Sequence, residues 1–382
     1  MNLQLILISL QDLFQRSQTE PRDSETHLNA TMRWLCRAQD VGDNDGVARM
    51  FDLRSGWGAS YPETTGYIIP TFLNYWKRTG ESEYYDRAIR MAKWESSVQM
   101  QSGAVQGGTM AHPPSPAIFN TGQVIFGWGA AYKESKEPVL MESMKHAADY
   151  LCEMQDSDGA WRRNLTAFCS APVDSYAYNI RTAWALLIAS VISGEARYAE
   201  CGKNNIEYVM GITRPENGWT EKNCLVDPAQ PLLHTIAYTF QGLLECALLS
   251  GRHDALEMVA KGNSQLHKAM ERHGGLYGRY DAAWHPTVRW RCLTGEAQTA
   301  IVWFRLADVT GDQEWRKRAV HLTTMLKRTQ ALAGDPNIVG GIKGSYPVYG
   351  WYGKFEYLNW AAKFFADALM LDMGDKRSGL NG

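Results

Sequence analysis

Carboxylate side chains stand ahead of several apolar segments of the sequence, and two of them are well placed for acid–base chemistry. Glu63 follows Tyr61 and Pro62 directly before one apolar segment, and Asp174 lies before another, in the Pro- and Tyr-containing stretch 171–179. Glycoside hydrolysis needs two carboxyl groups, one as acid and one as base or nucleophile. We therefore predict Glu63 and Asp174 as a catalytic pair. Helix capping is the alternative for both, because a carboxylate in a first turn complements the helix dipole.

A second set of polar side chains suits β-elimination or epimerisation at a uronic acid. Such chemistry needs a group that neutralises the substrate carboxylate, and a separate acid and base, often Tyr or His. His234, directly before Thr235, is the third catalytic candidate, with a hydrogen-bonded structural role as its alternative. The remaining candidates, as substrate-binding residues, are Asn120, Tyr176, Asn179, Arg181, Arg291, Tyr346 and Tyr352.

Aromatic residues are abundant and cluster in two loops. The chain has 14 Trp and 18 Tyr; Trp57 and Tyr61 fall in the glycine-rich stretch 55–63, and Trp351 and Tyr352 fall in 346–354. Flat apolar rings with polar rims suit sugars, so we predict that these residues stack on a carbohydrate. Packing is the alternative interpretation for most aromatic residues.

No metal or cofactor is expected. Cys224, Asp227 and His234 have the residue types of zinc ligands. They belong to a single link with no second ligand cluster, and coincidence explains them better. The stretch 340–344 resembles a phosphate-binding loop in composition only.

These residues are placed by an internal repeat. Threonines begin apolar segments at regular intervals, and an asparagine takes the corresponding place in a sixth unit: Thr65, Thr121, Thr182, Thr235, Thr294 and Asn359. Because Thr and Asn oxygens accept from the free N–H groups of a first helical turn, we predict that these residues are N-caps.

Two kinds of helix alternate along the repeat. The segments 183–192, 236–249, 297–309 and 360–371 are apolar nearly all round, which indicates complete burial. The helices between them carry one apolar stripe, such as Tyr85, Ala88, Ile89 and Ala92. We predict an all-α fold, an (α/α)6 toroid of six helical hairpins with inner buried helices and outer amphipathic helices. It would form one domain over 1–382, with an N-terminal helical extension (1–26) and a frayed tail (374–382).

The links between helices differ in length in a regular way. Links from an inner helix to the next outer helix are short, as at 193–194 and 250–251, whereas links from outer to inner helices reach about 20 residues or more. A toroid of this kind has one face of tight turns and one of long loops. Any site should lie on the long-loop face, at the N-termini of the inner helices.

Two segments carry a resemblance to known proteins. WGASYPETTGYIIPTFL (57–73) and GSYPVYGWYGKFEYLNWAAKFFADALM (344–370) resemble segments of bacterial exopolysaccharide-biosynthesis proteins of the α/α-toroid type. More broadly, the repeat is similar to the six-hairpin toroids of glycosidases, polysaccharide lyases, uronyl epimerases and the terpenoid-cyclase/prenyltransferase group. The resemblance implies carbohydrate chemistry, but it carries no catalytic motif over residue by residue.

Composition argues against nucleic acid and a membrane as partners. A net charge of −2 gives no basic field for nucleic acid, and no segment approaches the ~20 apolar residues of a membrane span. Seven scattered cysteines without a CxxC pair are typical of reduced thiols, so we expect a cytoplasmic protein. The leading hypothesis is a glycoside hydrolase acting on an oligo- or polysaccharide. A uronate lyase or epimerase, and a non-catalytic glycan-binding component of polysaccharide biosynthesis, are the alternatives.

Overall fold

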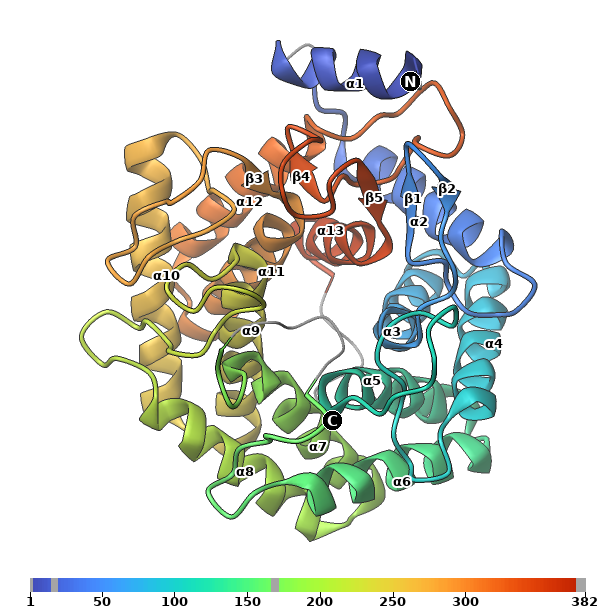
Figure 1. Cartoon of the computed structure of the whole chain (residues 1–382), viewed down its shortest axis with the longest axis vertical. Helices are drawn as coiled ribbons and strands as arrows, with labels where there is room; N and C mark the ends of the chain where they lie inside the picture. The colour runs from blue at the N-terminus through green and yellow to red at the C-terminus, as the bar shows by residue number, and fades with distance from the viewer. Residues whose placement is uncertain (1–2, 15–19, 166–171, 376–382) are drawn as a thin grey trace.

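The computed structural model describes residues 3–14, 20–165 and 172–375, and twelve of the α-helices in these residues form two concentric rings (Figure 1). The inner ring consists of α3 (Pro62–Thr79), α5 (Ile118–Ser135), α7 (Ile180–Ser193), α9 (Leu233–Ser250), α11 (Leu293–Thr310) and α13 (Asn359–Asp372). The outer ring consists of α2 (Ser24–Asp40), α4 (Ser82–Val98), α6 (Pro138–Met154), α8 (Ala196–Gly211), α10 (His253–His273) and α12 (Gln313–Lys327). The predicted (α/α)6 toroid is confirmed.

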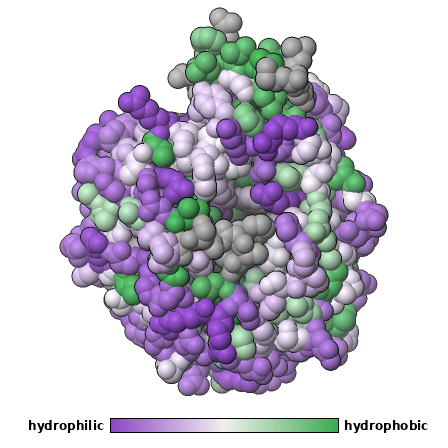
Figure 2. Space-filling model, in the orientation of Figure 1, coloured by the Kyte–Doolittle hydropathy of each residue, from purple (hydrophilic) through white to green (hydrophobic). Residues whose placement is uncertain are grey.

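Burial explains why the two rings have different sequences. Residues 180–189 of α7 are all buried, because this helix has neighbours on every side. In α4 the buried positions form one stripe that includes Tyr84, Ala88, Met91 and Ala92, and the remaining positions face water. Hydrophilic residues accordingly cover much of the surface around the ring (Figure 2).

The links also follow the predicted division. The short links turn through a left-handed glycine, Gly80 after α3 (φ 77°) and Gly194 after α7 (φ 78°). The long links gather on the other face, where they carry short strands and the 3₁₀ turn η1 (Ala177–Asn179). Strands β2 (Gly56–Trp57), β1 (Met50–Asp52) and β5 (Glu356–Leu358) form one antiparallel sheet, and β3 (Arg291–Cys292) pairs with β4 (Ser345–Tyr346).

The first sheet closes the ring. Strand β1 belongs to the link before α3, and β5 to the link before α13, and they pair with Phe51 opposite Tyr357. The side chain of Asn359 donates to the carbonyl of Ala48 at 3.0 Å and to the hydroxyl of Thr64 at 2.8 Å. The first and last units of the repeat are thereby joined.

The predicted N-cap role of the repeated threonines is wrong. Thr65 lies inside α3, whose N-cap residue is Tyr61, and its hydroxyl donates to the Tyr61 carbonyl while accepting from the amide of Val47. Thr121 accepts from the amide of Val105 in the same manner. These threonines therefore bind the preceding long link to the first turn of the inner helix.

Helix α1 (Leu3–Leu13) lies outside the two rings, at the top of Figure 1. It exposes hydrophobic side chains, among them Leu7, Leu10 and Leu13, which form the green area at the top of Figure 2. None of the helices in the described residues is long and apolar enough to cross a membrane. Most of the tail predicted over 374–382 lies outside the described residues.

Candidate active site

The N-termini of the inner helices surround a cavity of about 280 Å³ on the long-link face, which we call the central cavity. The structure brings five of the predicted site residues into its lining: Tyr61, Glu63, His234, Trp351 and Tyr352. It adds residues that were not predicted, chiefly Arg49, Tyr67, Phe119, Tyr178, Tyr238 and Trp360. The lining thus combines many aromatic rings with few ionisable groups, as in many small-molecule sites.

Glu63 is a buried carboxyl group in the first turn of α3. The hydroxyl of Tyr61 donates to Oε2 of Glu63 at 2.5 Å. Burial raises the pKa of Glu63 to about 7, although the Tyr61 hydrogen bond and the charges of Arg181 and Arg49 oppose this change. A carboxylate that only stabilised the helix dipole would have a lowered pKa. Glu63 can therefore gain or lose a proton near neutral pH, as a general acid or base must.

His234 lies in the first turn of α9, the helix opposite α3 in the ring (Figure 1). Its Nδ1 lies 2.8 Å from Oε1 of Gln298; with this oxygen as acceptor, Nδ1 carries the proton and Nε2 keeps a free lone pair. Burial lowers the pKa of His234 to about 4, and the nearby charge of Arg181 adds to this effect. At neutral pH His234 is thus an uncharged imidazole with about the basicity of a carboxylate.

Two tyrosines close the central cavity below these groups. Tyr67 follows Glu63 by one helical turn on α3, and Tyr238 follows His234 by one turn on α9. Tyr238 donates to the Tyr67 hydroxyl at 3.4 Å, so the two helices meet across the axis. In the sequence both tyrosines could have been found from the i+4 spacing, which places them on the same helix face as Glu63 and His234.

Arg181 lies in the interior, next to the tyrosine floor. Its guanidinium is 4.8 Å from the ring centroid of Tyr238 and donates to Gln123 and Gln241 at 2.8 and 2.6 Å. It is not among the residues lining the central cavity, and lines a smaller cavity with Lys363 and other residues instead. Arg181 thus influences the site through its charge, and its predicted contact with substrate is not supported.

The wall near α13 is aromatic. The Tyr352 hydroxyl accepts from Nε1 of Trp360 at 2.9 Å, and the Tyr352 ring lies 5.3 Å from that of His234. Trp351 extends outward with 54% of its surface exposed. Arg49 lines the cavity over the Trp360 ring at 5.6 Å, and its guanidinium lies 3.4 Å from the carboxylate of the partly buried Glu356.

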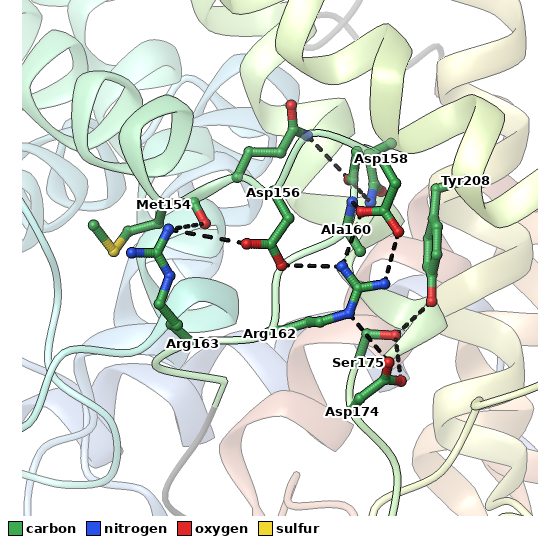
Figure 3. Close-up of polar contacts among 12 residues, drawn as sticks. Met154, Asp156, Asp158, Ala160, Arg162, Arg163, Asp174, Ser175 and Tyr208 are labelled. Atoms are coloured by element: carbon green, nitrogen blue, oxygen red, sulfur yellow. Dashed lines mark hydrogen bonds and ion pairs between the residues drawn. The ribbon is translucent and has the colours of Figure 1, made fainter.

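Asp174 is not part of this arrangement. It lies on the surface, where its carboxylate accepts from Arg162 at 3.1 Å and Lys222 at 2.6 Å. Figure 3 shows Arg162 between Asp174, Asp156 and Asp158, a network typical of a solvated ion-pair cluster. Hydrogen bonds from Lys222 and Arg162 lower the pKa of Asp174 to about 2. The structure therefore does not support pairing Asp174 with Glu63.

Several predicted binding residues pack beside the central cavity without lining it. Trp57 donates to Asn337 and packs against Trp34 at 5.2 Å, which is a structural role. Tyr176 stacks on Tyr178, at 5.3 Å and 9° between planes, and Tyr178 takes the lining position. Both candidate asparagines are buried; Asn120 donates to the Gln106 carbonyl and supports Tyr61, and Asn179 precedes α7.

Arg291 and Tyr346 lie in a neighbouring cavity. They are paired residues of strands β3 and β4, and Arg291 makes a two-point ion pair with the buried Glu296 at 2.7 and 2.6 Å. Arg291 was predicted to bind substrate, and it is not among the residues that line the central cavity. In the described part of the chain, no group of three or more His, Cys, Asp or Glu residues is arranged to hold a metal.

Comparison with known proteins bears on the fold. No protein-family model matches the sequence, and no curated protein matches it significantly. Among solved structures, an unsaturated glucuronyl hydrolase specific for heparin matches with a TM-score of 0.73 and 14% identity, over 94% of this chain and 99% of that chain. Cellobiose 2-epimerase from Bacillus thermoamylovorans B4167 matches with a TM-score of 0.72 and 11% identity, over 90% and 99%.

A D-mannose isomerase matches with a TM-score of 0.68 and 14% identity, over 91% of this chain and 97% of that chain. These neighbours are α/α-toroid carbohydrate-active enzymes, and they catalyse different reactions. At such low identities the likeness shows the fold alone.

Proposed function

We propose that the chain is a carbohydrate-processing enzyme that hydrolyses a glycosidic bond held in the central cavity, with Glu63 as the general acid. The observation that supports this most directly is the buried Glu63 carboxyl group with a pKa of about 7 in an aromatic cavity. A carboxyl group with a pKa near 7 keeps a substantial protonated fraction at neutral pH, and this form can donate to a leaving-group oxygen.

His234 supplies the second group that hydrolysis needs. As Glu63 protonates the glycosidic oxygen, the bond from this oxygen to the anomeric carbon breaks and a water oxygen bonds to that carbon. The neutral Nε2 of His234 accepts the water proton, as the second carboxylate does in an inverting glycosidase. His234 thus takes the place that we had assigned to Asp174, and the placement of the two groups on opposite helices suits attack from the side away from Glu63.

The substrate is held by stacking and by charge. Trp351, Tyr352 and Trp360 offer rings to the faces of the sugar. Arg49, which also pairs with Glu356, offers guanidinium N–H donors to an acidic substituent. The resemblance to exopolysaccharide-biosynthesis proteins supports a bacterial polysaccharide as the source of this sugar. A cytoplasmic location remains a prediction from the cysteine pattern.

Arg49 also supports a second candidate, elimination or epimerisation at a uronic acid. A cation beside the cavity can neutralise the substrate carboxylate, which makes the adjacent C–H bond easier to ionise, and His234 and Glu63 then serve as base and acid.

Product analysis separates these candidates. The full chain is incubated with a panel of neutral and uronate-containing oligosaccharides, and new reducing ends and ultraviolet absorbance are measured together. New reducing ends without absorbance support hydrolysis, absorbance identifies elimination, and a changed sugar configuration by NMR without cleavage identifies epimerisation. Binding without any turnover, unchanged in Glu63→Gln, would overturn the enzymatic proposal in favour of a glycan-binding component.

A further inference from the structure

Two further cavities lie beside the central cavity, between the links that precede α11 and α13. One, of about 440 Å³, shares Trp351 with the central cavity. The other, of about 480 Å³, shares Arg289, Pro347 and Tyr349 with the 440 Å³ cavity and reaches Leu13 of α1. We call these two cavities the outer groove. Their shared lining makes a path from the central cavity toward the N-terminal helix.

The outer groove is positively charged. Its described lining contains four cationic side chains, Arg289, Arg291, Arg328 and Lys354, and a single carboxylate, Asp12. The Asp12 carboxylate is already neutralised, because it accepts from Lys343 at 2.5 Å and from the amide of Val348 at 2.7 Å.

Within the described part of the chain, two of these cations have no anionic partner. Glu296 neutralises Arg291, and the exposed Glu20 lies 3.4 Å from Arg328. Arg289 and Lys354, in contrast, make no ion pair with any residue that the structure describes. Both line the section of the groove next to the central cavity. The path out of the cavity therefore carries positive charge that is free for a ligand.

The same section presents exposed aromatic surface on a firm base. Trp351 and Tyr349 are 54% and 38% exposed. The guanidinium of Arg279 lies 4.7 Å from the Trp351 ring, which holds that ring in place. Trp290 packs closely on Gly278: a Cβ atom added to Gly278 would lie 2.1 Å from the Trp290 ring. Exposed rings fixed in this way suit stacking against successive sugars.

We propose that the outer groove binds the continuation of an anionic oligosaccharide, a chain with carboxylate-bearing sugars, whose end lies in the central cavity. This inference rests on the proposed function of that cavity and names its substrate class. Exposed aromatic surface beside Arg289 and Lys354, which make no ion pair in the described part of the chain, matches a chain of uronate-type sugars. A single-stranded nucleic acid has similar chemistry, but the net charge of −2 provides no wider basic field for it.

Calorimetric titration tests whether the outer groove binds an acidic oligosaccharide. It uses a protein variant that does not cleave the oligosaccharide during the measurement. Glu63→Gln protein is titrated with a disaccharide, a tetrasaccharide and a hexasaccharide of uronate-containing chains, and with neutral oligosaccharides of the same lengths. We expect the affinity for the acidic series to rise at least about tenfold with length and to fall with added salt. The affinity for the neutral oligosaccharides should rise less with length.

Charge reversal locates the effect. Adding Arg289→Glu and Lys354→Glu should remove the gain in affinity with length for the acidic series. The matched control adds Lys203→Glu and Lys268→Glu, two exposed lysines on the outer helices α8 and α10, which change the net charge equally. The control should keep the gain, and both variants should unfold at similar temperatures.

The outcomes separate this inference from the proposed function. Length-dependent acidic binding that Arg289→Glu and Lys354→Glu abolish supports the groove even if the wild-type chain shows no turnover. Two results would overturn the proposed role of the groove and leave the proposed function standing. One is turnover of short sugars with no gain in affinity for longer acidic chains. The other is an equal loss of that gain in the control variant. Tighter binding of single-stranded RNA than of the acidic hexasaccharide would also overturn it.

Discussion

Tyr238 donates a hydrogen bond across the toroid axis to Tyr67, with 3.4 Å between the two hydroxyl oxygens. Each tyrosine lies four residues after one of the two candidate catalytic groups of the central cavity, Glu63 on α3 and His234 on α9. Residues four apart share a helix face, so the pair that joins the helices also sets Glu63 and His234 at matching depth. The candidate acid and base therefore lie on opposite walls above a common floor.

This arrangement predicts a bell-shaped dependence of kcat/KM on pH. Glu63 must be protonated to donate, and burial raises its pKa to about 7. His234 must be neutral to accept, and burial lowers its pKa to about 4. Both groups are in the required state between these values, so kcat/KM should be highest there, with limbs near pH 4 and pH 7. Rates measured from pH 3 to 9 check this, and a profile that still rises above pH 7 would contradict the acid role of Glu63.

Substitution of the two predicted carboxylates should have very different effects. Glu63→Gln keeps the shape of the side chain but removes the proton, and we expect kcat to fall by about 10² to 10⁴ with little change in substrate affinity. Asp174→Asn, the comparison variant, loses only exposed ion pairs with Arg162 and Lys222 and should keep wild-type turnover. Equal losses in both variants would restore the two-carboxylate mechanism.

Glu63 should also make the stability of the chain depend on pH. Its pKa is about 7 in the folded chain, against an ordinary glutamate pKa of 4.5, so the unfolded chain ionises first as pH rises. The stability that protonated Glu63 contributes is complete below pH 4.5 and is lost as pH rises to about 7, at roughly 1.4 kcal/mol per pH unit.

Glu63→Gln should therefore match the wild type near pH 4.5 and exceed its free energy of unfolding above pH 7, by roughly 3 kcal/mol. Urea denaturation of both proteins at several pH values measures the difference, in which the other titrating groups cancel. A difference that is constant with pH would show that Glu63 ionises normally in the folded chain.

The sequence predicted the fold well because the apolar pattern of each repeat unit indicates which helix is buried. Helices apolar on all sides, such as α7, have only one place in a toroid. It placed Glu63 and His234 at the mouth because Glu63 lies two residues before the repeated Thr65 and His234 directly before the repeated Thr235. It failed for Asp174 because position before an inner helix specifies the face of the toroid but not the distance from its axis. The partners that hold Asp174 outside, Arg162 and Lys222, come from its own link and the next one.

Other residues were missed because packing and function use the same residue types. Tyr67 and Tyr238 belong to buried helices and are indistinguishable in composition from core residues. Their i+4 spacing from Glu63 and His234 indicates a shared helix face, and the opposition of α3 and α9 reveals their contact. The reverse error applies to Trp57, whose glycine-rich surroundings indicated a ligand loop. In the structure its indole donates to Asn337 and fills space against Trp34.

Thr65 gives the last prediction, since it holds a site-bearing link rather than capping a helix. Thr65 accepts from the buried amide of Val47 at 2.9 Å, and the same link carries Arg49 and Tyr61 into the central cavity. Thr65→Val would leave this N–H group without a partner, at a cost of about 1–3 kcal/mol in the free energy of unfolding.

The control is Thr324→Val, because this exposed hydroxyl of α12 donates only to the carbonyl one turn before it. We expect a change there of no more than about 0.5 kcal/mol. Thr65→Val should also lower turnover, because Tyr61 positions the Glu63 carboxyl group and depends on this link. Denaturation and rate measurements on both variants decide the matter: equal stability in the two would mean that the threonine does not hold the link, and the repeat would then need another explanation.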